Sequence, residues 1–175
     1  VYIEGPEYET IALCGSNCGI SDIKEVAYAN YLCDELGLDT ISGGGVVAFA
    51  IECFQKGIIT KEQTDGKELK FGDIATFEYL IRKMALNSDP LGKLLAKGVK
   101  AASQKLSKGS KDFAIHEKGL EQSGYGIRDA VGMMGAYITC AVGGHHNRAW
   151  AITFDAEVGR DVVEGKAKRD IYLQH

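Results

Sequence analysis

The spacing of apolar residues is the feature that most limits what this chain can fold into. Apolar residues recur every three or four positions through most of the sequence, which is typical of amphipathic helices. Strand-like sequence is confined to residues 112–116, a run too short to build a sheet. We therefore expect a mainly α fold, made of helical domains with glycine-rich connections and at most one or two short strands.

Capping residues place the expected helices along the chain. Ser21 is a good N-cap for a helix that ends at Gly37, and three glycines form a loop before an apolar helix at residues 46–54. Asp73 and Asp89 should cap two more helices. The remaining helices are expected over residues 91–106, over residues 126–142, and from residue 155 to the end, where residues 166–175 carry no stop signal.

Both ends of the sequence look cut, and we expect two domains. Residues 1–110 would form a helical domain, and residues 111–175 the start of a second, truncated helical domain.

Charge and cysteine content limit the class of function. The net charge of −4 argues against electrostatic binding of nucleic acid. The longest apolar stretch is far shorter than the roughly 20 residues that span a bilayer. Five cysteines are an odd number, and none forms a C-x-x-C pair. We expect a cytoplasmic protein with reduced thiols that binds neither nucleic acid nor membrane.

Three polar clusters could carry chemistry. The first is residues 4–10, with three carboxylates before an apolar run, and its simpler interpretation is a solvated acidic turn. The second is residues 34–39, with two aspartates at a helix C-terminus, which is the unfavourable end for an anion. A surface aspartate beside a capping glycine is the alternative there. The third is residues 143–148, where two adjacent histidines could be ligands, proton carriers or plain surface.

Taken in order along the chain, these motifs resemble the tungsten-containing aldehyde ferredoxin oxidoreductases. The most specific motif is D-x-x-G-L-D at residues 34–39, which contacts a pterin of the tungsten cofactor in that family. The other stretches that resemble the family are residues 5–10, 15–20, 40–42, 49–53, 118–121 and 146–150.

The resemblance implies roles for individual residues near the first two clusters. Asp34 and Asp39 would hydrogen-bond the amino-pyrimidine end of one pterin, with Gly37 and Leu38 between them in the same motif. Glu9 matches a carboxylate beside the metal, which could take a proton from a water or from the hydrated substrate.

The third cluster supplies two further implied roles. His146 matches a histidine that can donate to a substrate or oxo oxygen, and Arg148 takes the place of a basic residue near the cofactor. Because cofactor dithiolenes hold the metal in this family, we expect no metal ligand among these residues.

The function that the resemblance implies is the oxidation of aldehydes to carboxylates with ferredoxin as electron acceptor. The full-length protein would carry a tungsten or molybdenum bis-pterin and a 4Fe-4S cluster, and would form a homo-oligomer. In this fragment neither cofactor is expected, so it should be inactive alone.

Three alternatives to this function remain. One is a related tungsten enzyme acting on another oxo or thioester substrate, and another is a non-catalytic helical module for packing or subunit binding. A redox module using Cys14 and Cys18 is the weakest, since they supply two of the four thiolates that a cluster needs.

Overall fold

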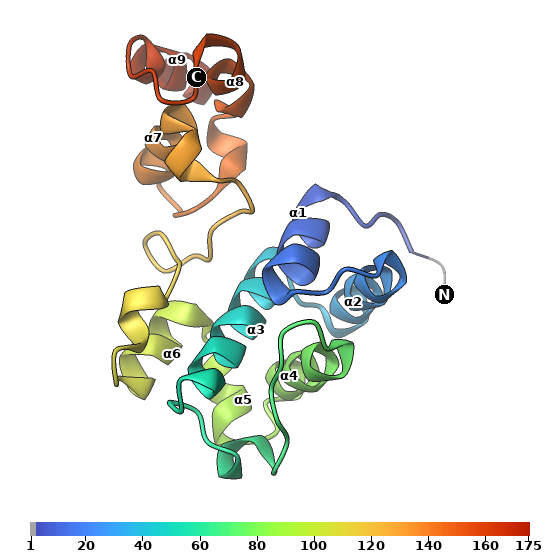
Figure 1. The fold of residues 1–175 in the computed structure, drawn as a ribbon. Coiled ribbons are helices and arrows are strands. Elements are labelled where there is room, and N and C mark those ends of the chain that lie inside the picture. Colours follow the sequence, from blue (N-terminus) through green and yellow to red (C-terminus); the bar gives the residue numbers. More distant parts are fainter. Residues whose placement is uncertain (1–2) are drawn as a thin grey trace. The chain divides into compact units, whose positions relative to one another are not determined.

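Helices joined by turns and loops make up the structure, a computed structural model that describes residues 3–175 (Figure 1). Within these residues there are nine α-helices and no β-strand, and one isolated bridge joins Glu117 to Leu120. The expected mainly α fold is confirmed. The chain divides into two compact units, Val1–Ile115 and His116–His175, where the sequence suggested a boundary after residue 110.

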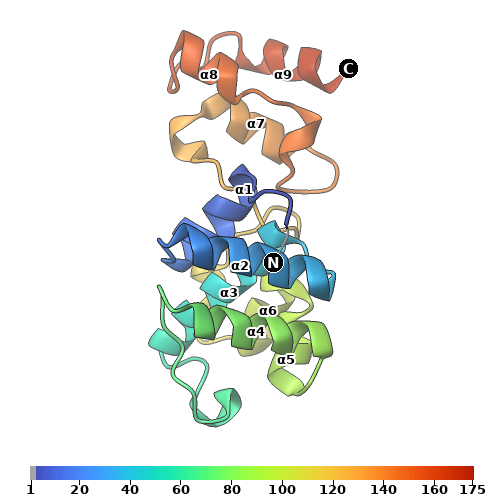
Figure 2. The ribbon, with the colours of Figure 1, turned by 90° about the vertical axis from the view of Figure 1, so that its right-hand side faces the viewer.

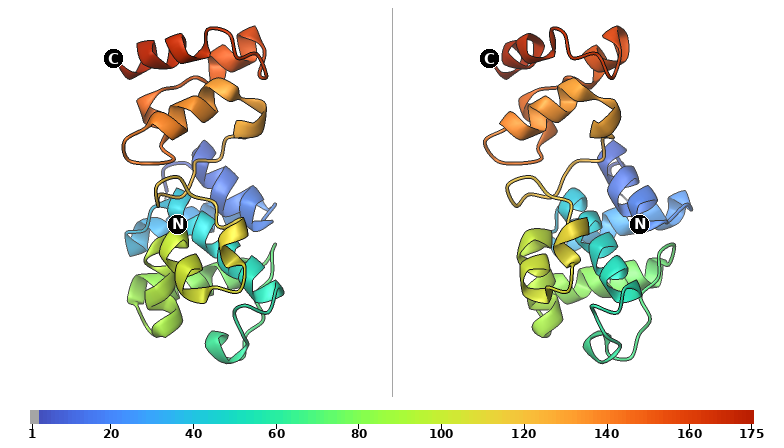
Figure 3. Two further views of the ribbon diagram at one scale, coloured as in Figure 1. Left: turned by 90° about the vertical axis from the view of Figure 1, so that its left-hand side faces the viewer. Right: turned by 60° about the vertical axis from the view of Figure 1, so that its left-hand side comes forward.

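Unit 1 is built around one buried helix, α3, which packs against α1, α2, α4 and α6. Figure 2 shows α2 and α4 side by side, and Figure 3 shows α6 beside α3. A single apolar core of 25 buried residues joins these helices. The elements are α1 (Tyr8–Thr10), a π-helix η1 (Ile11–Gly15), η2 (Ser16–Cys18), α2 (Ile23–Leu36), α3 (Thr40–Gln55), η3 (Glu62–Thr64), α4 (Ile74–Leu86), α5 (Pro90–Leu95), α6 (Gly98–Leu106) and η4 (Ser110–Phe113).

The three consecutive glycines lie inside α3, so the prediction of a glycine loop there was wrong. The side chain of Asp39 accepts a hydrogen bond from Ser42 N at 2.7 Å, and the helix begins at Thr40. A Cβ atom on Gly44 would lie 2.4 Å from the carbonyl oxygen of Leu13. Glycine therefore lets α3 approach the backbone of η1, and this packing outweighs its low helix propensity.

Three other predictions in unit 1 need correction. Asp22, rather than Ser21, caps α2, accepting a hydrogen bond from Lys24 N at 2.8 Å. The helix predicted over residues 91–106 is two helices, α5 and α6, because the chain turns before Gly98, whose φ of +84° is left-handed. Residues 112–116 form no strand, since the 3₁₀ turn η4 occupies the first part of them. Asp73 and Asp89 cap α4 and α5 as predicted.

Unit 2 has a much smaller core of four buried apolar residues. Its elements are η5 (Ile127–Asp129), α7 (Val131–Thr139), η6 (His146–Arg148), α8 (Ile152–Val158) and α9 (Lys166–Gln174). The helix predicted over residues 126–142 is therefore shorter at both ends. It begins where the Asp155 carboxylate accepts hydrogen bonds from Gly132 N at 3.0 Å and Met133 N at 2.8 Å. The helical pattern predicted from residue 155 to the end is interrupted in the structure: Asp155 lies inside α8, which ends before Gly159 with its φ of +110°, and the end of the pattern forms α9.

Within residues 3–175 no helix alone combines the length and apolar character needed to cross a bilayer. The pair α2 and α3, bent by 111° at their junction, does so only when the two are taken together and only by length and composition.

Candidate functional site

The D-x-x-G-L-D motif forms the corner between α2 and α3. Gly37 has a left-handed φ of +67°, and its N–H donates to Asp34 O at 3.2 Å, while Leu38 N donates to Cys33 O at 2.9 Å. This pair of hydrogen bonds is a Schellman ending for α2. Asp39 then caps α3. The motif thus ends one helix and begins the next, so it has a structural role of its own.

Both aspartates of this corner are exposed and keep an oxygen available. Asp34 Oδ2 accepts a hydrogen bond from Asn30 Nδ2 at 3.3 Å, and Asp39 Oδ2 accepts one from Ser42 N. Their Oδ1 atoms accept no hydrogen bond from residues 3–175. A Cβ atom on Gly37 would meet nothing within 4 Å, so the backbone between the two carboxylates is open. These residues fit a flat ligand with N–H donors, such as the amino-pyrimidine of a pterin.

The first cluster lies against this corner, so two of the three predicted clusters meet in unit 1. Thr10 Oγ1 lies 3.3 Å from Asn30 Oδ1 and 3.1 Å from Thr40 Oγ1. Asn30 Nδ2 also donates to Glu4 O at 3.2 Å. Leu38 is half-buried and packs against the apolar core, which positions the corner rather than offering a polar contact.

The three carboxylates of the first cluster lie in different environments. Glu4 and Glu7 are exposed, as expected of a solvated acidic turn, whereas Glu9 is 2% exposed. Burying a carboxylate costs free energy, so this position is a poor place for one without a specific use. Glu9 directly precedes Thr10, the residue that contacts α2 and α3. Its burial sets it apart from the other two acids.

The two histidines of the third cluster have different roles in unit 2. His145 Nδ1 accepts a hydrogen bond from Asn147 N at 3.1 Å, which caps the 3₁₀ turn η6. His146 is the first residue of that turn and is half-buried. Arg148, at the end of η6, is exposed and forms no ion pair within the part of the chain that the structure describes. Its predicted position near the cofactor stays a prediction.

His146 lies among aromatic rings and is fixed by a serine. Its ring centroid is 5.8 Å from that of Tyr125, 5.6 Å from that of Trp150 and 5.8 Å from that of His145. Ser123 Oγ, from a buried serine, lies 2.9 Å from His146 Nδ1. The Nε2 atom is on the opposite side of the ring from Ser123. No signal in the sequence pointed to Ser123, which approaches His146 only through the tertiary fold.

The structure brings some predicted site residues together and leaves others in separate units. Glu9, Asp34 and Asp39 belong to unit 1, whereas His146 and Arg148 belong to unit 2. The roles that the resemblance implies for Glu9 and His146 therefore stay predictions. No group of three or more His, Cys, Asp or Glu side chains within residues 3–175 could hold a metal ion.

The thiols proposed for a redox module are buried in the core of unit 1. Cys18 Sγ lies 3.3 Å from Leu13 O, and burial raises the pKa of Cys18 to about 12. A hydrogen bond with Cys33, together with burial, raises the pKa of Cys14 as well. Thiols of this kind stay protonated near neutral pH and are poor nucleophiles and ligands. The environment argues against a redox role for this pair.

A family model and individual relatives of known name agree on the family that this chain resembles. A model of the family described as aldehyde ferredoxin oxidoreductase, domains 2 and 3, matches residues 1–175. A tungsten-containing aldehyde ferredoxin oxidoreductase of Thermococcus kodakarensis is 38% identical over 151 residues, covering 86% of this chain and 24% of that protein. The WOR-like subunit of an aliphatic sulfonate oxidoreductase of Pyrococcus furiosus is 37% identical over 167 residues, covering 92% of this chain and 26% of the relative.

A solved structure shares the fold. The BamBC active site complex of benzoyl coenzyme A reductase with 1,5-dienoyl-CoA matches with a TM-score of 0.66 and 21% sequence identity, covering 99% of this chain and 28% of that one. The chain spans about a quarter of the length of the curated relatives it matches. The family match over the whole sequence and the identity to these relatives lead to one conclusion: this chain belongs to the aldehyde ferredoxin oxidoreductase family.

Proposed function

We propose that this chain forms part of a tungstopterin oxidoreductase that oxidises an aldehyde to a carboxylate and passes the electrons to ferredoxin. The observation that carries the proposal is the corner between α2 and α3, where Asp34 and Asp39 hold available oxygens on either side of an open glycine. When bound, the tungsten cofactor would supply the two-electron redox chemistry.

The way the chain itself holds the two aspartates of the corner supports this proposal. Ser42 N fixes Asp39 and Asn30 fixes Asp34 through their Oδ2 atoms, so each Oδ1 has a set direction. Asp34 Oδ1 and Asp39 Oδ1 would accept hydrogen bonds from the N–H groups of the amino-pyrimidine. Side chains held by other contacts lose little freedom on binding, which favours affinity. Arg148 would add positive charge near the anionic cofactor.

The proposed acid–base pair is Glu9 and His146. Oxidation of an aldehyde with water to a carboxylic acid releases two electrons and two protons, so side chains must accept protons at the reacting atoms. Glu9 would take a proton from the water or hydrated aldehyde, and His146 Nε2 would hold a proton at the substrate oxygen. Ser123 would orient the His146 ring through Nδ1.

Replacing Glu9 tests this assignment in the intact, anaerobically purified enzyme. We expect Glu9→Gln to lower turnover by roughly 100-fold or more, the usual effect of losing a general base, with unchanged tungsten content. Glu7→Gln is the matched control, because Glu7 is exposed and two residues away, and it should keep full turnover. Asp34→Asn should instead lower cofactor occupancy, measured as metal per chain.

Three outcomes would contradict the proposal. Full turnover of Glu9→Gln with full metal content would show that the carboxylate is not the base. Absence of tungsten and molybdenum from the purified protein would favour a non-catalytic helical module. Oxidation of sulfonates or reduction of thioesters in place of aldehyde oxidation would favour a related tungsten enzyme, as would be expected from the likeness to the sulfonate oxidoreductase subunit.

A further inference from the structure

Unit 1 has a cleft far from the α2–α3 corner. It has a volume of about 820 Å³ and lies between the segment after α3 and the helices α5 and α6. Pockets that bind small organic molecules have volumes of roughly 300–1,000 Å³. The floor is apolar, with contributions from Ile58, Leu91, Leu94 and Leu106.

The rim of this cleft is positively charged. Lys93, Lys97, Lys105 and Lys108 line it, and no Asp or Glu does. All four are exposed, and none forms an ion pair with the part of the chain that the structure describes. Residues 90–111 hold six lysines and no acidic residue, although the whole sequence has a net charge of −4. The local positive charge is therefore a property of this surface, and the fold itself does not use it.

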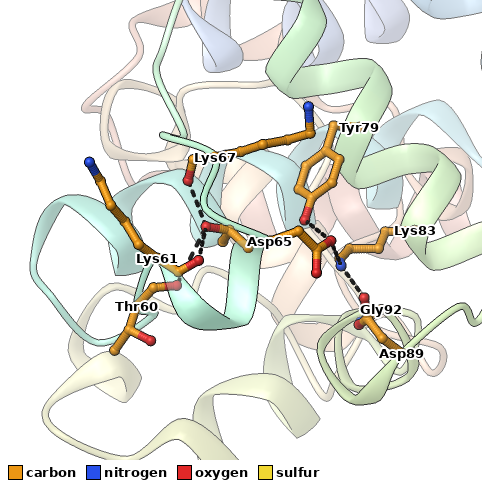
Figure 4. A network of polar contacts seen from close by, with 9 residues as sticks. Thr60, Lys61, Asp65, Lys67, Tyr79, Lys83, Asp89 and Gly92 are labelled. Carbon is orange, nitrogen blue, oxygen red and sulfur yellow. Dashed lines mark hydrogen bonds and ion pairs between the residues drawn. The ribbon is translucent and has the colours of Figure 1, made fainter.

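A buried lysine next to the cleft joins the turn after η3 to the start of α5 (Figure 4). Lys83 Nζ lies 2.7 Å from Asp65 Oδ2, which also accepts from Tyr79 OH at 2.8 Å, and it contacts Asp89 as well. Asp89 Oδ1 accepts from Gly92 N at 2.8 Å and caps α5. One lysine on α4 thus fixes both the turn after η3 and the start of α5. This network lies beside Pro90 and Leu91, which line the cleft.

The cleft and the α2–α3 corner lie at opposite ends of α3. Asp39 caps the N-terminus of this helix, whereas Ile58 of the cleft follows its C-terminus. A helix of 16 residues is about 24 Å long, so one small ligand cannot occupy both places. The cleft is distinct from the surface proposed for the pterin.

We propose that this cleft binds a small amphipathic organic anion, an apolar body with one acidic headgroup. The apolar body would lie on the leucine and isoleucine floor, where each Å² removed from water contributes about 25 cal/mol. The headgroup would lie between the ammonium groups of the rim. Because these groups are exposed, they attract an anion without any charge having to be buried. A concave apolar floor favours a small molecule over an acidic protein surface, because a protein would contact the lysines and leave the floor empty.

Calorimetric titration of the intact protein with octanoate tests this site. We expect saturable binding of octanoate and of octyl phosphate, and much weaker binding of acetate and of 1-octanol, which lack the body and the charge respectively. Lys97→Glu with Lys105→Glu should weaken octanoate binding by about tenfold, since two exposed ion pairs are lost and repulsion is added. Lys100→Glu with Lys111→Glu makes the same charge change on the same segment outside the lining and should leave the affinity within about twofold.

A third variant separates the floor from the rim. Ala101→Phe places a ring in the cleft without changing charge, and should weaken octanoate binding while the lysines remain. The proposal is overturned if octanoate does not bind, if acetate binds as well as octanoate, or if the control pair weakens binding as much as the cleft pair. Turnover of aldehyde reports separately on the proposed function, because no residue of the cleft belongs to the acid–base pair.

Discussion

Each unit buries one lysine among its described residues, and the surroundings of the two lysines differ. Lys83 of unit 1 pairs with Asp65 and Asp89, whose side chains are 66% and 26% exposed. Lys166 of unit 2 pairs with Asp155, whose side chain is fully buried. Unit 1 also has a core of 25 buried apolar residues, whereas unit 2 has four.

The comparison shows two ways of holding helices together. In unit 1 the apolar core joins the helices, and the lysine fixes a turn and a helix start near the surface. In unit 2 the Asp155 carboxylate on α8 accepts from Gly132 N and Met133 N of α7 and from Lys166 of α9. One carboxylate therefore connects three helices. In unit 2 this buried ion pair holds the helices together, whereas in unit 1 a larger apolar core does so.

The largest expected effect comes from removing the buried lysine of unit 2. Lys166→Met leaves Asp155 without its cation, and breaking a buried pair in this way costs about 3–5 kcal/mol in the free energy of unfolding. Lys83→Met should cost only about 1 kcal/mol, because Asp65 is solvated and a surface pair contributes little. Urea unfolding followed by Trp150 fluorescence reports on unit 2, since the sequence has one tryptophan.

An exposed lysine on the same helix provides the control for this prediction. Lys168→Met changes the same charge on α9 and should alter the urea midpoint little. Trp150 lies in unit 2, so for Lys83→Met in unit 1 the loss of stability is measured by hydrogen exchange, which reports on the two units separately. Equal losses for Lys166→Met and Lys83→Met would show that burial of the partner carboxylate does not set the cost.

The second effect is the change of stability with pH, which has opposite signs in the two units. Burial, and then the charge of Asp155, raises the pKa of Asp170 to about 6, above its value in the unfolded chain. The native state of unit 2 then binds more protons than the unfolded state between about pH 4 and 6, so its stability falls as pH rises through this window. The change is at most about 3 kcal/mol.

In unit 1 the pKa of the carboxylate that pairs with the buried lysine, Asp89, shifts in the opposite direction. Burial acts to raise the pKa of Asp89, but hydrogen bonds from Lys83 and from Gly92 N outweigh it and lower the pKa. Its contribution to stability is present above the unfolded pKa and is lost as pH falls. Asp170→Asn should remove the pH 4–6 slope from the Trp150 signal and raise the stability of unit 2 at pH 8. If Asp170→Asn keeps the pH 4–6 slope, the slope comes from another titratable group.

The smallest effect concerns two neighbouring glycines in the core helix of unit 1. Gly44→Ala should destabilise unit 1 by about 2 kcal/mol, because the Cβ would meet the backbone of Leu13 and no rotamer can relieve the contact. At Gly43 the nearest atom is Ile81 Cδ1 at 3.3 Å, the end of a flexible side chain. Gly43→Ala should therefore be nearly neutral, and thermal unfolding of both variants measures the difference.

Local signals in the sequence predicted the parts of the fold that local chemistry decides. Asp73 and Asp89 begin helices and Gly37 ends one, because capping involves only neighbouring residues. The position of Gly44 within α3 could not be predicted, since the reason for it is the backbone of Leu13, some thirty residues away. The break before Gly98 depends on how α5 and α6 pack, which the apolar spacing does not reveal.

The candidate site shows the same limit. The motif resemblance identified Asp34 and Asp39, and the structure shows them exposed with available oxygens. That Glu9 is buried while its acidic neighbours are not depends on how α1 packs, so the sequence left it unresolved. Ser123 was not predicted at all, because its partner His146 lies 23 residues away, beyond α7, and only the tertiary fold brings the two together.

The double use of Asp39 changes how this motif should be interpreted in sequences from distant relatives. Selection can retain Asp39 for helix capping even in a descendant that has lost its cofactor, since the cap on α3 would still be needed. Asp34 begins no helix, and its loss would remove the pterin contact that we propose for it at little structural cost. In such a lineage the first aspartate would drift while the last stayed fixed, so position 34 is the better marker of a retained cofactor.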